Sequence, residues 1–437
     1  MKSARFIVCE LLEKLEKSAY SNLALDGVLQ DQAISPRDKA FISRLFYGVI
    51  ERRVTLDHII SLYSSKPLQK LDTVILQALR MGIYQLLYMD SVPDNAAVNE
   101  SVELVKQLGK KSAAPFVNAV LRSFIRDGKK FSVPKDDIQR VCVEYSCSAE
   151  LADRLIKQYG EEKASEFLKR SLELHKLYLR VNNTKTDCDT LISEFAKAGI
   201  TVKKCTLLDN CLEAEPFGSV ENNDLFRKGL YHVQDLSSQL CCAALDPKKG
   251  EKILDICSAP GGKSFTITEI TDDECELYAC ELHDKRVKLI KNGTERLGLK
   301  SIKALQNDAK VFNESFPMFD KILCDVPCSG TGVIRSKPEI KYSDLKKAGG
   351  LPKIQYEILN TAAKYLKVGG ELVYSTCTVL KEENELVIDR FLEENEDFEG
   401  VSFLSEIGAP FGGYKASIIA ESFDCEGFFI SKIRRKY

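Results

Sequence analysis

Two cysteines in the last third of the chain each follow a short apolar run and are placed to do chemistry. Cys328 lies in Asp325–Gly332, with the order Asp-Val-Pro-Cys-Ser-Gly-Thr-Gly, and Cys377 lies in Tyr374–Thr378. Most of the fifteen cysteines are best interpreted as small buried side chains, but that interpretation weakens for a pair at the ends of neighbouring strands. A thiolate is a strong nucleophile. The pair therefore predicts covalent catalysis by Cys328 and Cys377, with Asp325 as the nearby acid.

A glycine-rich turn lies upstream of the cysteines, also at the end of an apolar run. Residues Ile253–Ile256 lead into Cys257–Lys263, with the order Cys-Ser-Ala-Pro-Gly-Gly-Lys, and a helical pattern follows. Glycine in such a turn lets a ligand approach the backbone closely, although tight turns also need glycine for steric reasons alone. The segment has neither the spaced glycines of a dinucleotide site nor the complete pattern of a triphosphate loop. It favours a nucleoside cofactor that has no diphosphate.

Two acids stand at the ends of the next two strand candidates. Glu281 lies about where nucleotide-binding folds place the carboxylate that accepts ribose hydroxyl groups. Asp308 could accept a hydrogen bond from an adenine amino group, and it could equally be the N-cap of a helix. Together with the glycine-rich turn, these acids predict a nucleoside pocket.

A nucleophilic cysteine beside a nucleoside pocket suits the methylation of a pyrimidine ring. Carbon 5 of a pyrimidine does not take up a methyl group unaided, and addition of a thiolate to carbon 6 makes carbon 5 reactive. The proton on carbon 5 must then leave and the thiolate must be expelled, which a second cysteine can assist. Hydrogen bonding at N3 makes the ring more electrophilic, and Asp325 is the expected carboxyl group. Cys324, inside the preceding strand, should point to the opposite side and pack.

The elements that must position these residues follow from the apolar spacing along the chain. From Ser3 to about Ile125 apolar residues recur every three or four positions, which predicts an all-α bundle. A small α+β unit is expected from Leu177, where the pattern begins to alternate. Beyond Tyr231, short apolar runs alternate with helical patterns, as in a doubly wound parallel sheet that binds ligands at the carboxyl ends of its strands. The strand candidates are Lys252–Cys257, Leu277–Glu281, Lys303–Asn307, Lys321–Asp325 and Glu371–Thr376.

We therefore predict a multidomain fold with three parts. A chain of 437 residues is long enough for several cores. Residues 1–130 form an all-α domain, and residues 131–232 form linking helices with a small α+β unit of RRM-like type. Residues 233–437 form an α/β Rossmann-like catalytic domain.

The composition is that of an ordinary globular protein, and it limits which membrane, metal or RNA partners can be expected. Met1–Leu15 has the pattern of an amphipathic helix and not of a signal peptide, and the most apolar stretch, Val74–Met89, falls short of a membrane span. Because no Cys-x-x-Cys pair occurs and the chain has four histidines, we expect no metal site. We expect a monomeric cytoplasmic protein. The net charge is −2, so an RNA-binding surface must be a local basic patch, with candidates Lys106, Lys110, Lys111, Arg122, Arg126, Lys129, Lys130, Arg335, Lys337 and Lys341.

At its motifs the chain resembles the RNA cytosine-5 methyltransferases. In its layout it is similar to the RsmB/Sun/Fmu-type branch, whose members methylate bacterial 16S ribosomal RNA. The segments Asn95–Val102 and Phe116–Arg122 are similar to the RNA-binding factor NusB, which makes 1–130 a NusB-like domain. The resemblance implies S-adenosylmethionine as the cofactor, Cys377 as the nucleophile and Cys328 as the residue that assists product release. Such a reaction needs no metal.

The resemblance also assigns the cofactor site. Glu281 stands where the family more often has Asp, and it keeps the charge. In the substrate-side loop Gly332–Tyr342, Tyr342 stands where Trp is usual and is expected to stack on a base. Gly427–Phe429 matches the family's last strand. The residues expected at the cofactor are Cys257, Ser258, Ala259, Pro260, Gly261, Gly262 and Lys263 at the methionine end, Glu281 at the ribose, Asp308 at the adenine and Asp325 near both cofactor and base.

Two alternatives to methylation of 16S ribosomal RNA stay open. One is cytosine-5 methylation of another RNA, such as transfer RNA, by the same chemistry. The other is a non-catalytic RNA-binding factor whose N-terminal bundle does the work, although intact Cys328, Cys377, Asp325 and Lys263 argue against it. A protein or small-molecule methyltransferase would have no use for an attacking cysteine.

Overall fold

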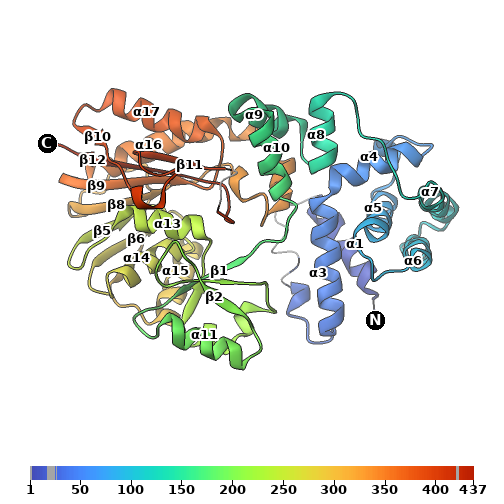
Figure 1. The fold of residues 1–437 in the computed structure, drawn as a ribbon, viewed down its shortest axis with the longest axis horizontal. Helices are drawn as coiled ribbons and strands as arrows, with labels where there is room; N and C mark the ends of the chain where they lie inside the picture. The colour runs from blue at the N-terminus through green and yellow to red at the C-terminus, as the bar shows by residue number, and fades with distance from the viewer. Residues whose placement is uncertain (1, 17–24, 26, 420–422) are drawn as a thin grey trace. The chain divides into compact units, whose positions relative to one another are not determined.

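The computed structural model describes residues 2–16, 25, 27–419 and 423–437. Met1, at the start of the predicted first helix, lies outside them. The chain divides into two compact units. The first is Met1–Leu172 together with Ser336–Ser343, and the second is Glu173–Arg335 together with Asp344–Tyr437. Figure 1 labels the helices and strands of both units.

The first unit is helical, as predicted. Its helices are α1 (Ala4–Leu15), α3 (Pro36–Glu51), α4 (Arg53–Tyr63), α5 (Thr73–Tyr88), α6 (Asp94–Gln107), α7 (Ala114–Arg126), α8 (Asp137–Tyr145), α9 (Ala149–Tyr159) and α10 (Glu161–Arg170). Side chains of Ser3, Ser35 and Asp72 accept hydrogen bonds from backbone N–H groups in the first turns of α1, α3 and α5. Helices α1 and α3 to α7 bury their apolar faces in one core.

Helix α5 is the most buried helix of this core, and it explains why the apolar stretch Val74–Met89 is interrupted by polar residues. Arg80 is buried and donates to both carboxylate oxygens of Asp57, at 2.6 and 2.7 Å. Gln85 is buried and donates to the carbonyl of Met81 within the helix. These polar groups are therefore paired inside the bundle. Within the described part of the chain, no helix is both long and apolar enough to cross a membrane.

The second unit begins with a small antiparallel sheet in the order β2-β3-β1-β4. Its strands are β1 (Leu177–Val181), β2 (Val202–Lys204), β3 (Cys211–Ala214) and β4 (Tyr231–Val233), and its helices are α11 (Cys188–Lys197) and α12 (Asp224–Arg227). The alternation predicted from Leu177 is confirmed. Leu179 and Val181 are buried in one core with Leu191 and Phe195 of α11.

The larger sheet of the second unit contains every predicted strand. Its strands are β5 (Lys252–Asp255), β6 (Glu276–Glu281), β7 (Ile302–Gln306), β8 (Phe319–Asp325), β9 (Leu366–Thr376), β10 (Phe398–Gly400), β11 (Lys415–Ile418) and β12 (Phe428–Arg435). The order is β10-β12-β9-β8-β5-β6-β7, with β11 paired to β12. Strands β5 to β9 are parallel, but β12 is antiparallel to β9, and β10 and β11 are antiparallel to β12. The prediction of a parallel sheet is therefore wrong at this edge, and the sheet is mixed.

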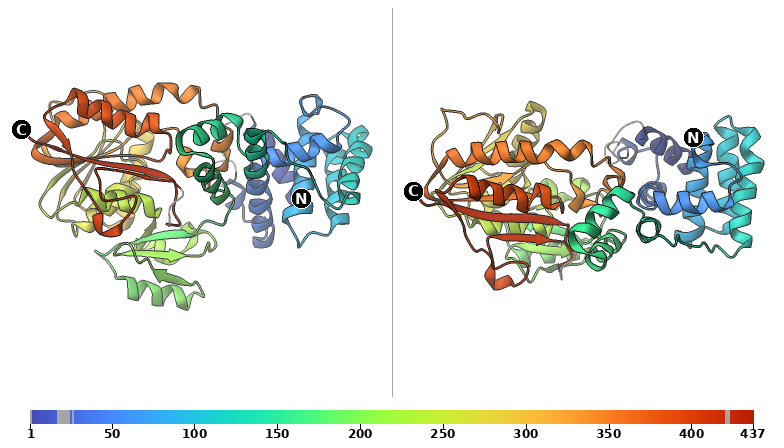
Figure 2. Two further views of the ribbon diagram at one scale, coloured as in Figure 1. Left: turned by 45° about the horizontal axis from the view of Figure 1, so that its top comes forward. Right: turned by 90° about the horizontal axis from the view of Figure 1, so that it is seen from above.

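Side chains of the larger sheet alternate between two cores, one on each face. Ile253, Leu323 and Val373 belong to one core, whereas their neighbours Leu254 and Leu372 belong to the other. Because both faces are covered by helices, a ligand can reach the parallel strands only at their ends (Figures 1 and 2). Helices α13 (Leu236–Leu245), α14 (Gly262–Ile270) and α15 (Asp284–Leu297) pack in the first core, and α16 (Leu351–Lys364) and α17 (Glu385–Glu394) pack in the second.

Candidate active site

A cavity of about 340 Å³ lies at the carboxyl ends of the parallel strands in the second unit. Glu281 ends β6, Asp308 follows β7, and Asp325 ends β8. Cys328 follows β8 and Cys377 follows β9. All of these residues line the cavity, so the structure brings together side chains that the sequence places nearly a hundred positions apart.

The glycine-rich turn joins β5 to α14 in a conformation that requires glycine at Gly261. Its φ is 111°, in the left-handed region, and a Cβ at this position would lie 2.5 Å from the ring of Phe265. The backbone N–H of Ser258 holds the turn to the sheet by donating to the carbonyl of Cys280 at 2.7 Å. Of the residues predicted for the cofactor, Cys257 and Ala259 line the cavity, and Ser258, Pro260, Gly261, Gly262 and Lys263 complete the same turn.

Asp255 supports this turn and was not among the predicted site residues. It ends β5, is 1% exposed, and accepts a hydrogen bond from the hydroxyl of Ser264 at 2.6 Å. Burial raises the pKa of the Asp255 carboxyl to about 7. The sequence does carry a signal for it, since an acid that ends an apolar strand directly before a glycine-rich turn is expensive to bury without a purpose.

The two acids predicted for the nucleoside both line the cavity. Glu281 is buried, accepts from the backbone N–H of His283 at 3.0 Å, and lies 3.1 Å from the guanidinium of Arg286. Asp308 accepts from the backbone N–H of Lys310 at 3.0 Å, so it caps a turn and not a helix. The capping contact and the position at the cavity are compatible, since a carboxylate has two acceptor oxygens. The ribose and adenine roles stay predictions.

Asp325 forms an ion pair with Lys263 that sequence reasoning missed. Oδ2 of Asp325 lies 2.8 Å from Nζ of Lys263, and Oδ1 accepts from the hydroxyl of Ser375 at 2.8 Å. The ammonium of Lys263 also lies 5.1 Å from the ring centre of Phe428. Burial by itself would lower the pKa of Lys263, but the groups around it, the Asp325 carboxylate foremost, together raise the pKa. Lys263 is therefore a cation beside Asp325 at neutral pH.

The sulfur atoms of Cys328 and Cys377 lie 3.2 Å apart. This contact arises because β8 and β9 are adjacent and parallel, with Asp325 opposite Ser375, so the loops after both strands leave the same edge of the sheet. The hydrogen bond with Cys377 and burial raise the pKa of the Cys328 thiol well above its ordinary value. Cys328 therefore stays protonated. Cys324 is fully buried in the core under α16, as predicted.

Gly332 binds the backbones of three segments together beside the cysteines. Its N–H donates to the carbonyl of Cys377 at 2.9 Å, and its carbonyl accepts from the N–H of Gly427 at 3.0 Å. A Cβ at Gly332 would lie 1.9 Å from the carbonyl oxygen of Gly427. Only glycine fits here, so the spacing between the loops of Cys328 and Cys377 depends on this residue.

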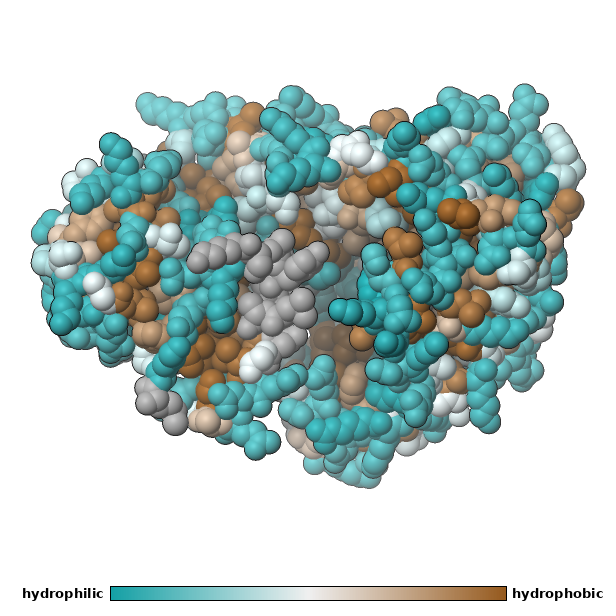
Figure 3. Space-filling view, turned by 180° about the vertical axis from the view of Figure 1, so that it is seen from behind, coloured by the Kyte–Doolittle hydropathy of each residue, from teal (hydrophilic) through white to brown (hydrophobic). Residues whose placement is uncertain are grey.

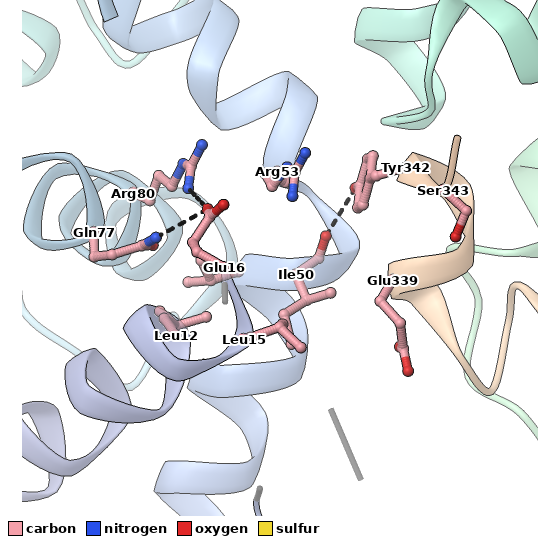
Figure 4. A pocket seen from close by; sticks show the side chains of 11 residues that line it. Leu12, Leu15, Glu16, Ile50, Arg53, Gln77, Arg80, Glu339, Tyr342 and Ser343 are labelled. Carbon is pink, nitrogen blue, oxygen red and sulfur yellow. Dashed lines mark hydrogen bonds and ion pairs between the residues drawn. The ribbon is translucent and has the colours of Figure 1, made fainter. Parts of the chain in front are cut away.

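The structure gives Tyr342 a packing role in place of the predicted stacking on a base. Tyr342 belongs to the first unit, where its hydroxyl donates to the carbonyl of Ile50 at 2.8 Å and the guanidinium of Arg53 lies 4.5 Å from the centre of its ring (Figure 4). Its neighbour Lys341 is fully buried and donates to the carbonyl of Glu51 at 2.9 Å. The ring is therefore already engaged within the protein.

Part of the predicted basic patch is neutralised by acids of the first unit. Lys106 pairs with Glu103, Lys110 with Asp72 and Lys129 with Asp94, each at 2.6 Å. The remaining candidates behave differently. Arg122 and Arg126 are exposed on α7, and they donate hydrogen bonds to the uncharged side chains of Asn118 and Ser123, respectively. Three lysines are exposed as well, namely Lys111, Lys130 and Lys337. Arg335 pairs with Asp424, and Lys341 is buried.

Three family models match successive parts of the chain. The NusB family model matches residues 2–126, the ferredoxin-like domain of RsmF/B-like methyltransferases matches 149–221, and the model described as 16S rRNA methyltransferase RsmB/F matches 242–434. The last of these spans the larger sheet with all of the predicted site residues. The all-α, small α+β and Rossmann-like parts predicted from the sequence are thereby confirmed as a fold.

Relatives match the chain over its length. The probable ribosomal RNA small subunit methyltransferase B of Bacillus subtilis is 39% identical and covers 99% of both chains. The protein of the same description from Synechocystis sp. is 31% identical over 78% of each chain. The solved structure of PH0851 is 23% identical, with a TM-score of 0.84, and covers 100% of this chain and 99% of that chain, which shows a shared fold. The chain therefore belongs to the RsmB/F family of 16S rRNA methyltransferases.

Proposed function

We propose that the protein transfers a methyl group from S-adenosylmethionine to carbon 5 of a cytosine in 16S ribosomal RNA, through a covalent bond between Cys377 and carbon 6. The observation that carries this proposal is the contact of Cys328 and Cys377 at 3.2 Å in the cavity that Asp325 also lines. Two cysteines at one nucleoside site have a use in this reaction that they lack in methyl transfer to an amine or hydroxyl group.

The lining of the cavity fits the proposed cofactor. Carboxylates of Glu281 and Asp308 can accept hydrogen bonds from ribose hydroxyl and adenine amino groups, and Ile256, Val326 and Ile358 provide apolar walls for a purine. When bound, S-adenosylmethionine supplies an electrophilic methyl group. Within the described residues, no cluster of three or more His, Cys, Asp or Glu side chains could hold a metal ion.

The first covalent step uses Cys377 and Asp325. The Cys377 thiolate forms a bond to carbon 6, and the electron pair of the C5–C6 double bond moves so that carbon 5 becomes the nucleophile. We assign the hydrogen bond at N3 of the base to Asp325 in its protonated form, with the ammonium of Lys263, 2.8 Å away, orienting this side chain. This polarisation draws electrons from the ring as the thiolate adds.

Product release uses Cys328. After methyl transfer the proton on carbon 5 leaves, the bond from sulfur to carbon 6 breaks, and the C5–C6 double bond is restored. Cys328 accepts the carbon 5 proton as it passes its own proton to the departing sulfur of Cys377, which lies 3.2 Å away. A cysteine that is still protonated when release begins suits this relay.

The RNA partner must present an unstacked base. Neither face of carbon 6 can be reached by a thiolate inside a helix, so the target nucleotide has to leave its stack. We therefore propose a single-stranded or looped target in the ribosomal RNA.

Substitution of each cysteine tests the assignment of roles. We expect Cys377→Ala to abolish methyl transfer while cofactor affinity, measured by calorimetry, stays at the wild-type value. We expect Cys328→Ala to accumulate a covalent protein–RNA adduct, visible on a denaturing gel with labelled RNA, because release is blocked after addition. An adduct with Cys377→Ala and none with Cys328→Ala would reverse the two roles.

The substrate is tested by methyl transfer from labelled S-adenosylmethionine to unmodified 16S RNA, transfer RNA and a DNA duplex in parallel, followed by nucleoside analysis. Label in 5-methylcytidine from the 16S RNA is the expected result. Label in transfer RNA alone would keep the chemistry and replace the substrate. No label in any nucleic acid would favour the non-catalytic RNA-binding factor.

A further inference from the structure

A buried carboxylate lies between the loops of the two cysteines, and neither the sequence motifs nor the proposed steps use it. Glu383 ends the short 3-10 helix Lys381–Glu383 that follows Cys377, and it is 1% exposed. Burying a carboxylate is costly unless hydrogen bonds replace its water. Its partners therefore indicate what it stabilises.

On one side, Glu383 holds the loop of Cys328. Its Oε2 accepts from the backbone N–H of Ser329 at 2.9 Å and from the side-chain amide of Gln355 at 2.9 Å. The same amide nitrogen of Gln355 donates to the carbonyl of Pro327 at 3.0 Å. The residues directly before and after Cys328 are thus fixed to one buried pair of side chains.

On the other side, Glu383 and its neighbour Asn384 hold the loop of Cys377. Oε1 of Glu383 accepts from the hydroxyl of Thr378 at 3.3 Å, and the side-chain amide of Asn384 donates to the carbonyl of Thr378 at 2.9 Å. The hydroxyl of Thr378 also lies 2.8 Å from that of Ser329. The residue after Cys377 and the residue after Cys328 therefore share Glu383 as a common partner.

The negative charge of Glu383 also acts on one thiol. The hydrogen bond with Cys377 and burial are the largest causes of the raised pKa of Cys328, and the Glu383 carboxylate raises it further. The partners of Glu383 named above are uncharged hydrogen-bond donors, so they leave its charge in place. A neutral residue of the same shape would remove this electrostatic effect.

We propose that Glu383 is a positioning residue for the methyl transfer, which holds Cys328 and Cys377 against the same base. Its negative charge also helps to keep Cys328 protonated for release. The inference rests on the proposed function. Carbons 5 and 6 of the base are bonded neighbours, so both sulfur atoms must stay within contact distance for addition at one and proton removal at the other. A shift of about 1 Å in such an arrangement can lower the rate by roughly a hundredfold.

Glu383→Gln tests the arrangement, because the amide keeps the volume of the side chain but turns one acceptor position into a donor. We expect kcat on 16S RNA to fall by roughly tenfold or more, while KM and cofactor affinity stay near the wild-type values. Glu385→Gln is the matched control, since Glu385 lies two positions later and accepts from Ser417. A Glu383→Gln variant with the kcat of the wild type would overturn the inference.

A second measurement needs no RNA and so separates this inference from the proposed function. The rate of Cys328 alkylation by iodoacetamide is followed against pH by mass spectrometry of its peptide, in a Cys377→Ser background with and without Glu383→Gln. We expect the profile to move to lower pH when Glu383 is neutral, at an unchanged melting temperature. An alkylation profile that does not move would overturn the inference, and an early melting temperature in the same variant would show that Glu383 has only a structural role. Wild-type protein that methylates no RNA would overturn the proposed function instead.

Discussion

The ion pair of Lys263 and Asp325 is expected to affect both the turnover of the enzyme and the free energy of unfolding. Asp325→Asn leaves the largely buried ammonium of Lys263 without its counter-charge, so we expect a loss of about 3 kcal/mol in unfolding free energy as well as a loss of turnover. The double variant Lys263→Met, Asp325→Asn should recover most of the stability and none of the turnover. Urea unfolding and methyl transfer on the same preparations measure both quantities.

The opposite result at this pair would be informative. If the double variant recovered turnover together with stability, the two side chains would only support the fold, and the N3 hydrogen bond would need another donor. If Asp325→Asn unfolded no more easily than the wild type, the buried charge of Lys263 would have to be relieved by water.

Residue chemistry is predictable from sequence where it depends on type and local order. Cys328, Cys377 and Asp325 are predictable because each lies at or shortly after the end of an apolar run, and neighbouring parallel strands end at one edge. The partners of Lys263 and Glu383 were not found, because those contacts join residues 62 and 54 positions apart. No local pattern encodes such pairings, which depend on how the loops pack.

At the scale of elements, the segment Ser336–Ser343 is the clearest departure from sequence order. It lies between Cys328 and α16 along the chain, yet it packs in the first compact unit. There Lys341 is fully buried and donates to the carbonyls of Glu51 and Tyr145 at 2.9 and 3.4 Å. Burial lowers the pKa of Lys341 to about 8.

Lys341 makes the stability of this segment depend on pH. The unfolded chain keeps the proton of Lys341 up to its ordinary pKa of about 10.4, so between pH 8 and that value the unfolded state binds more protons and stability rises with pH. We expect the wild type to gain up to about 3 kcal/mol relative to Lys341→Met between about pH 8 and pH 10.5. Urea titrations of both proteins across this range measure it, and parallel curves would contradict it.

The positions of the parallel strands were predicted, but the strand directions at one edge of the sheet were not. The strands β5 to β9 were located within a few residues, because their apolar runs are bounded by turns and charged residues. The antiparallel edge of β12 with β10 and β11 was missed, because strand direction at an edge is set by where the chain returns and not by residue pattern. The packing of Tyr342 in the first unit was also missed, because it depends on tertiary contacts and not on residue pattern.

On the scale of the whole molecule, a net charge of −2 means that RNA binding relies on particular side chains and not on a general field. The face in Figure 3 is mostly hydrophilic, with hydrophobic side chains in small separate groups. Charged residues that already have opposite partners attract phosphate less, since the acid cancels much of their field. The arginines of helix α7 therefore differ from the ion-paired lysines of the first unit, because Arg122 and Arg126 are exposed and bond to uncharged side chains.

This difference predicts which half of the basic patch contacts RNA. We expect Arg122→Ala, Arg126→Ala to weaken binding of 16S RNA and to reduce the slope of log affinity against log salt by about 1 to 2, because unpaired guanidinium groups release counterions from phosphate. Lys106→Ala, Lys110→Ala removes the same charge from ion-paired positions and should change the slope far less. Filter binding across a salt series compares the two, with cofactor affinity as the control for folding. Equal losses in both variants would mean that the ion pairs open on contact with RNA, and the unpaired arginines of α7 would then have no special place in the interface.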